Sequence, residues 1–248
     1  MENKDLKFID IHCHYDCLSL EHLKETFSKQ EMIAVTNNID IDSYRKFESF
    51  RKANISGLYF AYGLYPEVVV NRGLKDSLNY LEIILEDTKD ILAIGEIGLD
   101  YKITKDPEIR REQKIIFEKQ LEIAKNRKLP VIIHSRYATK AVLDVLESYS
   151  GFPIILHWFT GNEREIQTAL DRGYYLTLRF NKPIIHNIKE HLNQIFIETD
   201  YPIYYEGKPI EITDIKRSYE IFAKENGIEI TKLKEIINNN FIKVFLKK

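Results

Sequence analysis

The sequence predicts a (β/α)8 barrel that fills the chain as one domain, residues 1–248. Eight short apolar runs, rich in β-branched and aromatic residues, recur along the chain. Helical patterns separate these runs, which indicates parallel strands because parallel neighbours need crossover connections. An open doubly wound sheet is the alternative, but it usually has fewer strands, and the first run lacks the glycine fingerprint of a dinucleotide site.

The expected strands and helices alternate from end to end. The strands lie near residues 7–14, 31–37, 57–64, 91–97, 130–135, 153–158, 173–180 and 195–200. Between the third and fourth strands, residues 74–85 place five apolar side chains on one helical face. Asp106 and Pro107 mark the start of the helix before the fifth strand, as N-cap and first helical residue. Two helices, 211–225 and 230–246, are expected after the last strand.

Composition and charge exclude several classes of protein. No apolar run approaches the roughly 20 residues of a membrane helix, and the first residues, "MENKDLKF", do not resemble a secretory signal. The two cysteines, Cys13 and Cys17, favour reduced thiols over a disulfide framework, so we expect a cytoplasmic protein without membrane contact. A net charge of −2 provides no global attraction for nucleic acid, which favours single strands or ends over long duplexes as partners.

Potential metal ligands stand at the ends of five of the expected strands. The first strand, in "FIDIHCHYD", carries His12 and His14, which share a face because side chains alternate along a strand. The other strand ends contribute one residue each: Glu96, His134, His157 and Asp200. Since catalytic groups of such barrels lie at the carboxyl ends of the strands, these six side chains are expected to surround one small volume.

Four histidines and two carboxylates form a ligand set for divalent metals such as Zn or Mn. Six ligands are too many for one tetrahedral ion. Two ions that share a bridging carboxylate, about 3.5–4 Å apart, use the whole set.

Five motifs in order along the chain resemble the TatD family of metal-dependent deoxyribonucleases, a branch of the amidohydrolase-like barrels. They are the His-x-His pair at 12–14, "GEIGLDY" at 95–101, "PVIIHSRYA" at 130–138, "LHWFTG" at 156–161 and "ETDYP" at 198–202. The resemblance covers nearly the whole chain. It implies a phosphodiester hydrolase with His12, His14, Glu96, His134, His157 and Asp200 as ligands of divalent ions (Zn, Mn or Mg), acting on DNA through an activated water and without a protein nucleophile.

Within this reading, each ligand receives a role. His12, His14 and Asp200 are assigned to one ion, His134 and His157 to the other, and Glu96 to the bridge. Glu96 and Asp200 are the catalytic carboxylates, with Asp200 also placed to accept the proton of the water. Glu198, on the same strand face as Asp200, either orients a ligand or forms a structural salt bridge.

Substrate contacts are expected from side chains just beyond the strand ends. Arg136 is the candidate phosphate clamp, whereas Lys102, Arg179 and Lys182 are expected mostly as solvated loop charges. Tyr65 and Tyr101 are candidate contacts for an unpaired base, as are Trp158 and Tyr201, with core packing as the alternative for each.

Three departures from the family pattern concern the substrate. Tyr65, in "GLYP", replaces the histidine that members commonly carry there, and the segment "IYYEGKPIEI" after Asp200 is short. Trp158 in "HWFTG" is similar to the TatD-like proteins of Qat anti-phage defence cassettes. Two alternatives therefore stay open: a hydrolase of another phosphorylated or C–N/C–O substrate, although Glu96 in place of a carboxylated lysine disfavours dihydroorotase-like members, and a defence-complex subunit active only with its partners.

Overall fold

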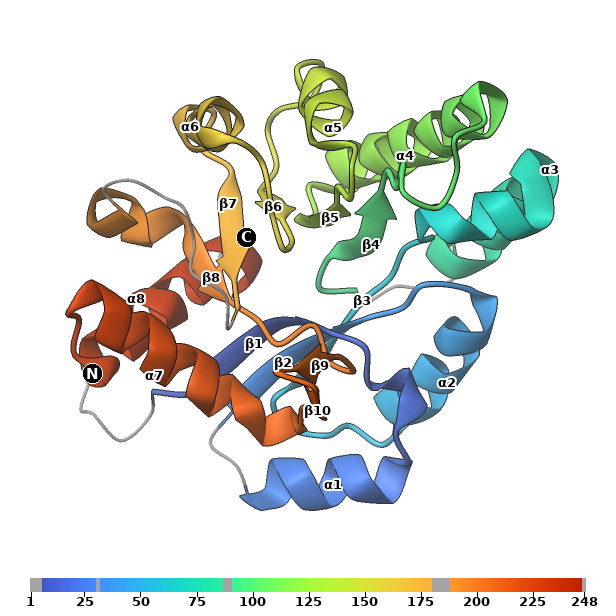
Figure 1. The fold of residues 1–248 in the computed structure, drawn as a ribbon. Coiled ribbons are helices and arrows are strands. Elements are labelled where there is room, and N and C mark those ends of the chain that lie inside the picture. The colour runs from blue at the N-terminus through green and yellow to red at the C-terminus, as the bar shows by residue number, and fades with distance from the viewer. Residues whose placement is uncertain (1–5, 30–31, 87–90, 180–187, 247–248) are drawn as a thin grey trace.

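The computed structural model describes residues 6–29, 32–86, 91–179 and 188–246. Eight parallel strands form its centre, and helices α1 to α7 lie around their outside (Figure 1). The strands are β1 (Phe8–Cys13), β2 (Met32–Asn37), β3 (Leu58–Ala61), β4 (Ile94–Gly98), β5 (Val131–His134), β6 (Ile154–Leu156), β7 (Tyr175–Leu178) and β8 (Ile195–Ile197). All eight strands predicted from the sequence are present.

The strands close into a barrel through two seams. Parallel pairing joins β1–β2–β3 and, separately, β4 through β8. A bridge between Ala61 and Ala93 links β3 to β4, and the backbone N–H of Tyr62 donates to the Ala93 carbonyl at 3.1 Å. At the other seam, the N–H of Asp200 donates to the His12 carbonyl at 3.0 Å. The predicted (β/α)8 fold is confirmed.

The helices follow the strands in the expected alternation. They are α1 (Leu20–Lys29), α2 (Ile41–Lys52), α3 (Pro66–Glu86), α4 (Pro107–Arg127), α5 (Thr139–Leu146), α6 (Glu163–Asp171), α7 (Ile215–Asn226) and α8 (Ile230–Phe241). Asp106 caps α4 as predicted, because its side chain accepts from the Glu108 N–H at 2.8 Å. The helix expected from residue 211 begins later, since a tight 3-10 turn (Ile212–Asp214) precedes α7.

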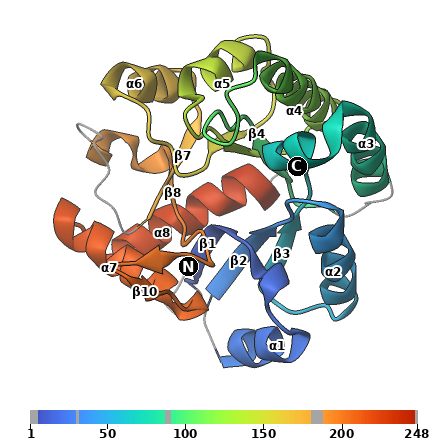
Figure 2. The same cartoon turned by 45° about the vertical axis from the view of Figure 1, so that its right-hand side comes forward.

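The carboxyl-terminal helix covers the amino-terminal end of the barrel. Beyond α8 the chain continues as a π-helical turn (Ile242–Leu246), and α8 runs across the barrel centre in Figure 2. Phe241 packs against Tyr59 of β3, and Phe245 packs against Phe196 of β8. Apolar side chains of this segment thus cover the amino-terminal end, and the candidate ligands lie at the opposite, carboxyl-terminal end.

An antiparallel hairpin lies in the connection from β8 to α7. Its strands are β9 (Tyr204–Tyr205) and β10 (Lys208–Pro209), joined through Glu206 and Gly207, both with positive φ. Two central residues with positive φ are typical of a type I′ hairpin turn. This hairpin is not among the elements predicted from the sequence. Among the described residues, no helix combines the length and the apolar character that crossing a membrane requires.

Candidate metal centre

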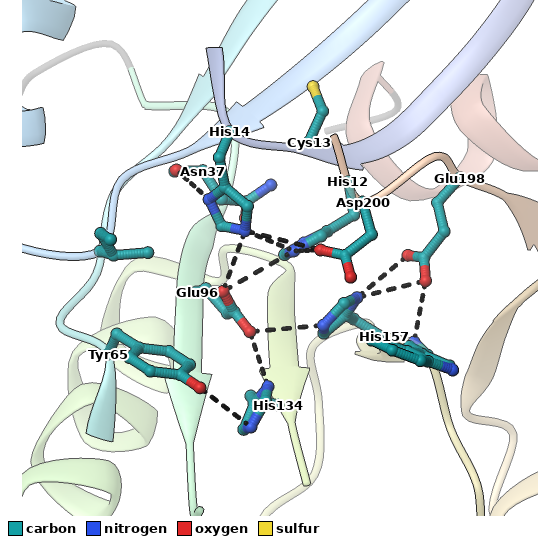
Figure 3. Close-up of polar contacts among 12 residues, drawn as sticks. His12, Cys13, His14, Asn37, Tyr65, Glu96, His134, His157, Glu198 and Asp200 are labelled. Atoms are coloured by element: carbon teal, nitrogen blue, oxygen red, sulfur yellow. Dashed lines mark hydrogen bonds and ion pairs between the residues drawn. The ribbon is translucent and has the colours of Figure 1, made fainter. Parts of the chain in front are cut away.

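The six predicted ligand residues come together at the mouth of the barrel (Figure 3). Five of them are almost fully buried, and His14 is partly exposed. Cys13, between His12 and His14, points away from the group and donates its S–H towards the Val35 carbonyl at 3.5 Å. The alternation predicted for this strand therefore separates the polar face from the packed face.

Irregular strand pairing occurs next to two of the candidate ligands. The β1–β2 register shifts between Asp10 and Cys13, around His12, and the β4–β5 register shifts between Ile94 and Ile97, around Glu96. Such bulges re-aim a side chain next to a functional site. Gly98 then permits close strand contact, because a Cβ at its position would lie 2.1 Å from the His134 carbonyl oxygen.

The first group of ligand atoms has the spacing of a coordination shell. Nε2 of His12 and Nε2 of His14 lie 3.2 Å apart. Each lies 3.3–3.7 Å from Oε2 of Glu96 and 3.6–3.7 Å from Oδ1 of Asp200. Ligands about 2.1 Å from one ion at tetrahedral angles lie roughly 3.4 Å from each other. These atoms therefore fit a divalent ion between them.

A second group gathers on the other oxygen of Glu96. Oε1 lies 2.8 Å from Nδ1 of His134 and 3.4 Å from Nε2 of His157. The donor set of two imidazoles and a carboxylate again suits a divalent ion of the Zn or Mn type. One carboxylate thus faces both groups.

Outer contacts fix which nitrogen of His14 and of His157 faces the centre. Nδ1 of His14 lies 3.0 Å from the Asn37 carbonyl, to which it donates. Nδ1 of His157 lies 3.2 Å from both oxygens of Glu198, so Glu198 orients this ring. Partners of this kind set the tautomer and orientation of a ligating histidine.

Charges in the group are strongly coupled. Burial opposes the charged form of each histidine, but Glu96 and Asp200 raise the pKa of His14 to about 9, and Glu198 raises the pKa of His157 to about 9. Burial together with His157 holds the pKa of His12 well below its usual range. Burial raises the pKa of Asp200 to about 6, while the surrounding histidines hold the pKa of Glu96 well below its usual range despite its burial. Glu96 is therefore ionised at neutral pH.

Asp100 is a buried residue of the site that the sequence analysis missed. Its Oδ2 accepts from the Tyr65 hydroxyl at 2.9 Å and from the Arg136 Nε at 2.8 Å, and it lies 3.1 Å from Nε2 of His134. Asp100 thereby connects two predicted substrate residues to a predicted ligand. Asp100 lies just past the fourth strand, in "GEIGLDY", as Asp200 lies just past the eighth. This position at a strand end could have indicated a residue of the site.

Asp10, also overlooked, holds the other side of the site. It accepts from the Thr199 hydroxyl at 2.6 Å and from the Thr199 N–H at 3.0 Å. Thr199 lies between Glu198 and Asp200, so this buried contact fixes the backbone that carries both carboxylates.

The other predicted substrate residues differ in their surroundings. Tyr101 packs against the core, with the Arg110 guanidinium 4.4 Å from its ring centroid. Arg179 is not the solvated loop charge that was expected: its side chain is 11% exposed and lies over the Trp158 ring. Lys182 lies outside the described residues.

Fold and ligand groups together define a barrel hydrolase of the metal-dependent class. The chain belongs to the TatD family, as the family model described as TatD related DNase matches residues 9–246. The family predicted from the five motifs is thus confirmed.

Similar proteins support the same assignment. The chain is 27% identical to an uncharacterized metal-dependent hydrolase of Buchnera aphidicola, over 96% of this chain and 98% of that protein. It is 27% identical to the human deoxyribonuclease TATDN3, over 96% of this chain and 94% of the relative. The crystal structure of the TatD homologue YjjV from Escherichia coli superposes with a TM-score of 0.79 at 21% identity and covers 98% of this chain and 100% of that one, which shows the shared fold.

Proposed function

We propose that this chain is a two-ion phosphodiesterase, and specifically a deoxyribonuclease that acts on single strands or DNA ends. The observation that supports two ions is the division of Glu96, whose Oε2 faces His12 and His14 while its Oε1 faces His134 and His157. A carboxylate shared in this way is the bridge of a two-ion site. DNA as substrate is supported by the family match and by the deoxyribonuclease named among the relatives.

In this proposal His12, His14 and Asp200 hold one ion, His134 and His157 hold the other, and Glu96 contacts both. Divalent ions bound there would supply an activated water and neutralise charge on the phosphoryl oxygens. Asp200 is the carboxylate placed to accept the proton of that water. Its Oδ1 faces His12 and His14, and its Oδ2 lies 3.2 Å from Nη1 of Arg179. The carboxylate therefore has a fixed orientation.

Arg136 is proposed to bind the substrate phosphate beside the second group, and Tyr65 to contact the substrate next to it. Asp100 holds Nε and Nη2 of Arg136, which leaves other N–H donors of the guanidinium for a phosphate oxygen. The hydroxyl of Tyr65 is committed to Asp100, so Tyr65 would act through its ring and by keeping Asp100 in place. For Tyr101, packing under Arg110 favours a structural role over the predicted base contact.

The test is cleavage of end-labelled single-stranded DNA in Mg, Mn or Zn, with and without a chelator. We expect divalent-dependent cleavage that is lost in Glu96→Ala and retained in Glu21→Ala, the same substitution on the exposed face of α1. Loss in both variants would point to damage unrelated to the site. Metal-loaded wild-type protein that cleaves neither single strands nor DNA ends would overturn the nuclease proposal and favour another phosphorylated substrate or a requirement for partners.

Action in the cytoplasm with other proteins of an anti-phage defence cassette stays a prediction from the sequence. It rests on Trp158 in "HWFTG". Co-purification of the tagged chain with the products of neighbouring genes is the direct test, and recovery of the chain alone from its own host would count against it.

A further inference from the structure

Trp158 is held at the mouth of the barrel with its indole partly exposed. It follows His157 directly, and the two ring centroids lie 6.4 Å apart. The backbone N–H of Trp158 donates to Oγ1 of Thr177 at 2.7 Å and to Oε1 of Glu198 at 3.0 Å. Its φ is 38°, a region that non-glycine residues rarely adopt, and 39% of the residue is exposed. A fixed backbone therefore keeps a large aromatic ring beside the candidate metal centre instead of in the core.

Arg179 covers one face of this ring. Its Cζ lies 3.1 Å from the indole centroid, and its Nη1 lies 3.2 Å from Oδ2 of Asp200. The guanidinium is thus held between the indole and a candidate ligand, with N–H donors beyond the one that Asp200 accepts. Since Arg179 occupies one face of the partly exposed indole, a ligand that stacks on this ring would use the opposite face.

We propose that Trp158 and Arg179 form a subsite for one unpaired nucleotide. The base stacks on the face of the indole opposite Arg179, and the guanidinium donates to the phosphate attached to that nucleotide. Aromatic rings beside positive charge bind single strands in this way because every base has a face that can stack. A base inside a duplex is already stacked on its neighbours, so the subsite selects single strands or frayed ends. This inference rests on the proposed function and names its substrate class.

The chain offers a direct optical test, because Trp158 is its only tryptophan. Metal-loaded wild-type protein is titrated with an oligothymidine strand of phosphorothioate linkages, which resist hydrolysis. A matched strand with abasic sugars at every position is the control. We expect saturable quenching of the tryptophan fluorescence by the first strand and little by the second. Equal quenching by both strands, or none by either, would overturn the stacking.

Kinetics on the protein side complete the test. The wild type and the variants Trp158→Ala and Trp158→Phe are compared on ordinary strands and on strands with an abasic site next to the cleaved bond. We expect wild type to prefer the ordinary strand about 5- to 100-fold in kcat/KM, Trp158→Phe to retain part of that preference, and Trp158→Ala to lose it. Metal content and thermal unfolding of each variant check that the fold is retained.

The two proposals fail in different ways. Cleavage without base-dependent quenching or abasic discrimination would leave the nuclease in place and remove the subsite. Base-dependent quenching without cleavage of any strand would support the subsite and remove the proposed hydrolysis of DNA.

Discussion

Oδ2 of Asp100 lies 3.1 Å from Nε2 of His134, on the side of the imidazole opposite the centre. With Nε2 occupied by this contact, Nδ1 is the nitrogen that faces Glu96, at 2.8 Å. Carboxylates that accept from the outer nitrogen of a ligating histidine fix its tautomer and orientation. Asp100 is therefore a positioning residue for the second ligand group.

Asp100→Asn should lower the affinity for the ion held by Glu96, His134 and His157 by about 10- to 100-fold, because the neutral amide is a weaker acceptor for His134. Binding by the first group should change little. Competition with a chromogenic chelator measures the ion affinity of both ligand groups. Asp106→Asn is the control, since this residue caps α4 and asparagine caps a helix equally well. Equal loss at both ion sites would contradict the positioning role.

Removal of the phosphate clamp should affect the substrate more than the metal. Arg136→Ala is expected to lower kcat/KM on DNA roughly 10- to 100-fold, the value of a hydrogen bond to a charged group. Arg136→Lys should recover only part of it, because an ammonium cannot make the planar contacts of a guanidinium. Metal content should stay unchanged, as Asp100 keeps Tyr65 and His134 as partners. Arg111→Ala is the control, because the Arg111 side chain lies on the exposed face of α4. Unaltered kcat/KM in Arg136→Ala would contradict this role.

Metal affinity should rise with pH. Neighbouring carboxylates raise the pKa of His14 and of His157 to about 9. Without an ion, both imidazoles are therefore in their positively charged, doubly protonated form at neutral pH. An ion must displace those protons, and affinity should increase up to about tenfold per pH unit for each proton released, levelling off above about pH 9. Chelator competition between about pH 6 and about pH 9, with proton release followed in weak buffer, measures this. Affinity that is constant across the range would contradict it.

Stability can be lowered without touching the site. The buried hydroxyl of Tyr219, on α7, accepts from the Ile9 N–H at 3.0 Å and donates to the Ile9 carbonyl at 3.2 Å. Tyr219→Phe should reduce the free energy of unfolding by about 1–3 kcal/mol, because it leaves buried backbone groups of β1 unpaired. Denaturant unfolding measures this change, and metal content should be unaffected. Tyr204→Phe, at an exposed tyrosine, should leave stability unchanged.

The sequence was sufficient to predict the barrel and to place the candidate ligand residues at one end of it. Each strand is a local apolar run, and the parallel order brings the carboxyl ends of all strands to one mouth. Residues such as His12 and Asp200 could therefore be placed together although 188 positions separate them. Predicting that they lie close together requires only the strand order and not the packing of side chains.

The contacts beyond the ligands depended on packing that has no local pattern. Arg179 is buried because Trp158 and Asp200, each 21 positions away, lie on either side of its guanidinium. Asp100 contacts His134 two residues beyond the point where Gly98 of β4 pairs closely with His134 of β5. The β9–β10 hairpin turns on Glu206 and Gly207, a pair less typical of such turns than Asn-Gly.

The most direct test of the two-ion centre is the number of divalent ions per chain, measured by native mass spectrometry after saturation and desalting. With Glu96 as the bridge, wild-type protein should hold two ions and Glu96→Gln at most one. A wild-type chain that holds fewer than two ions, or a Glu96→Gln variant that keeps both with unchanged affinity, would contradict the two-ion centre.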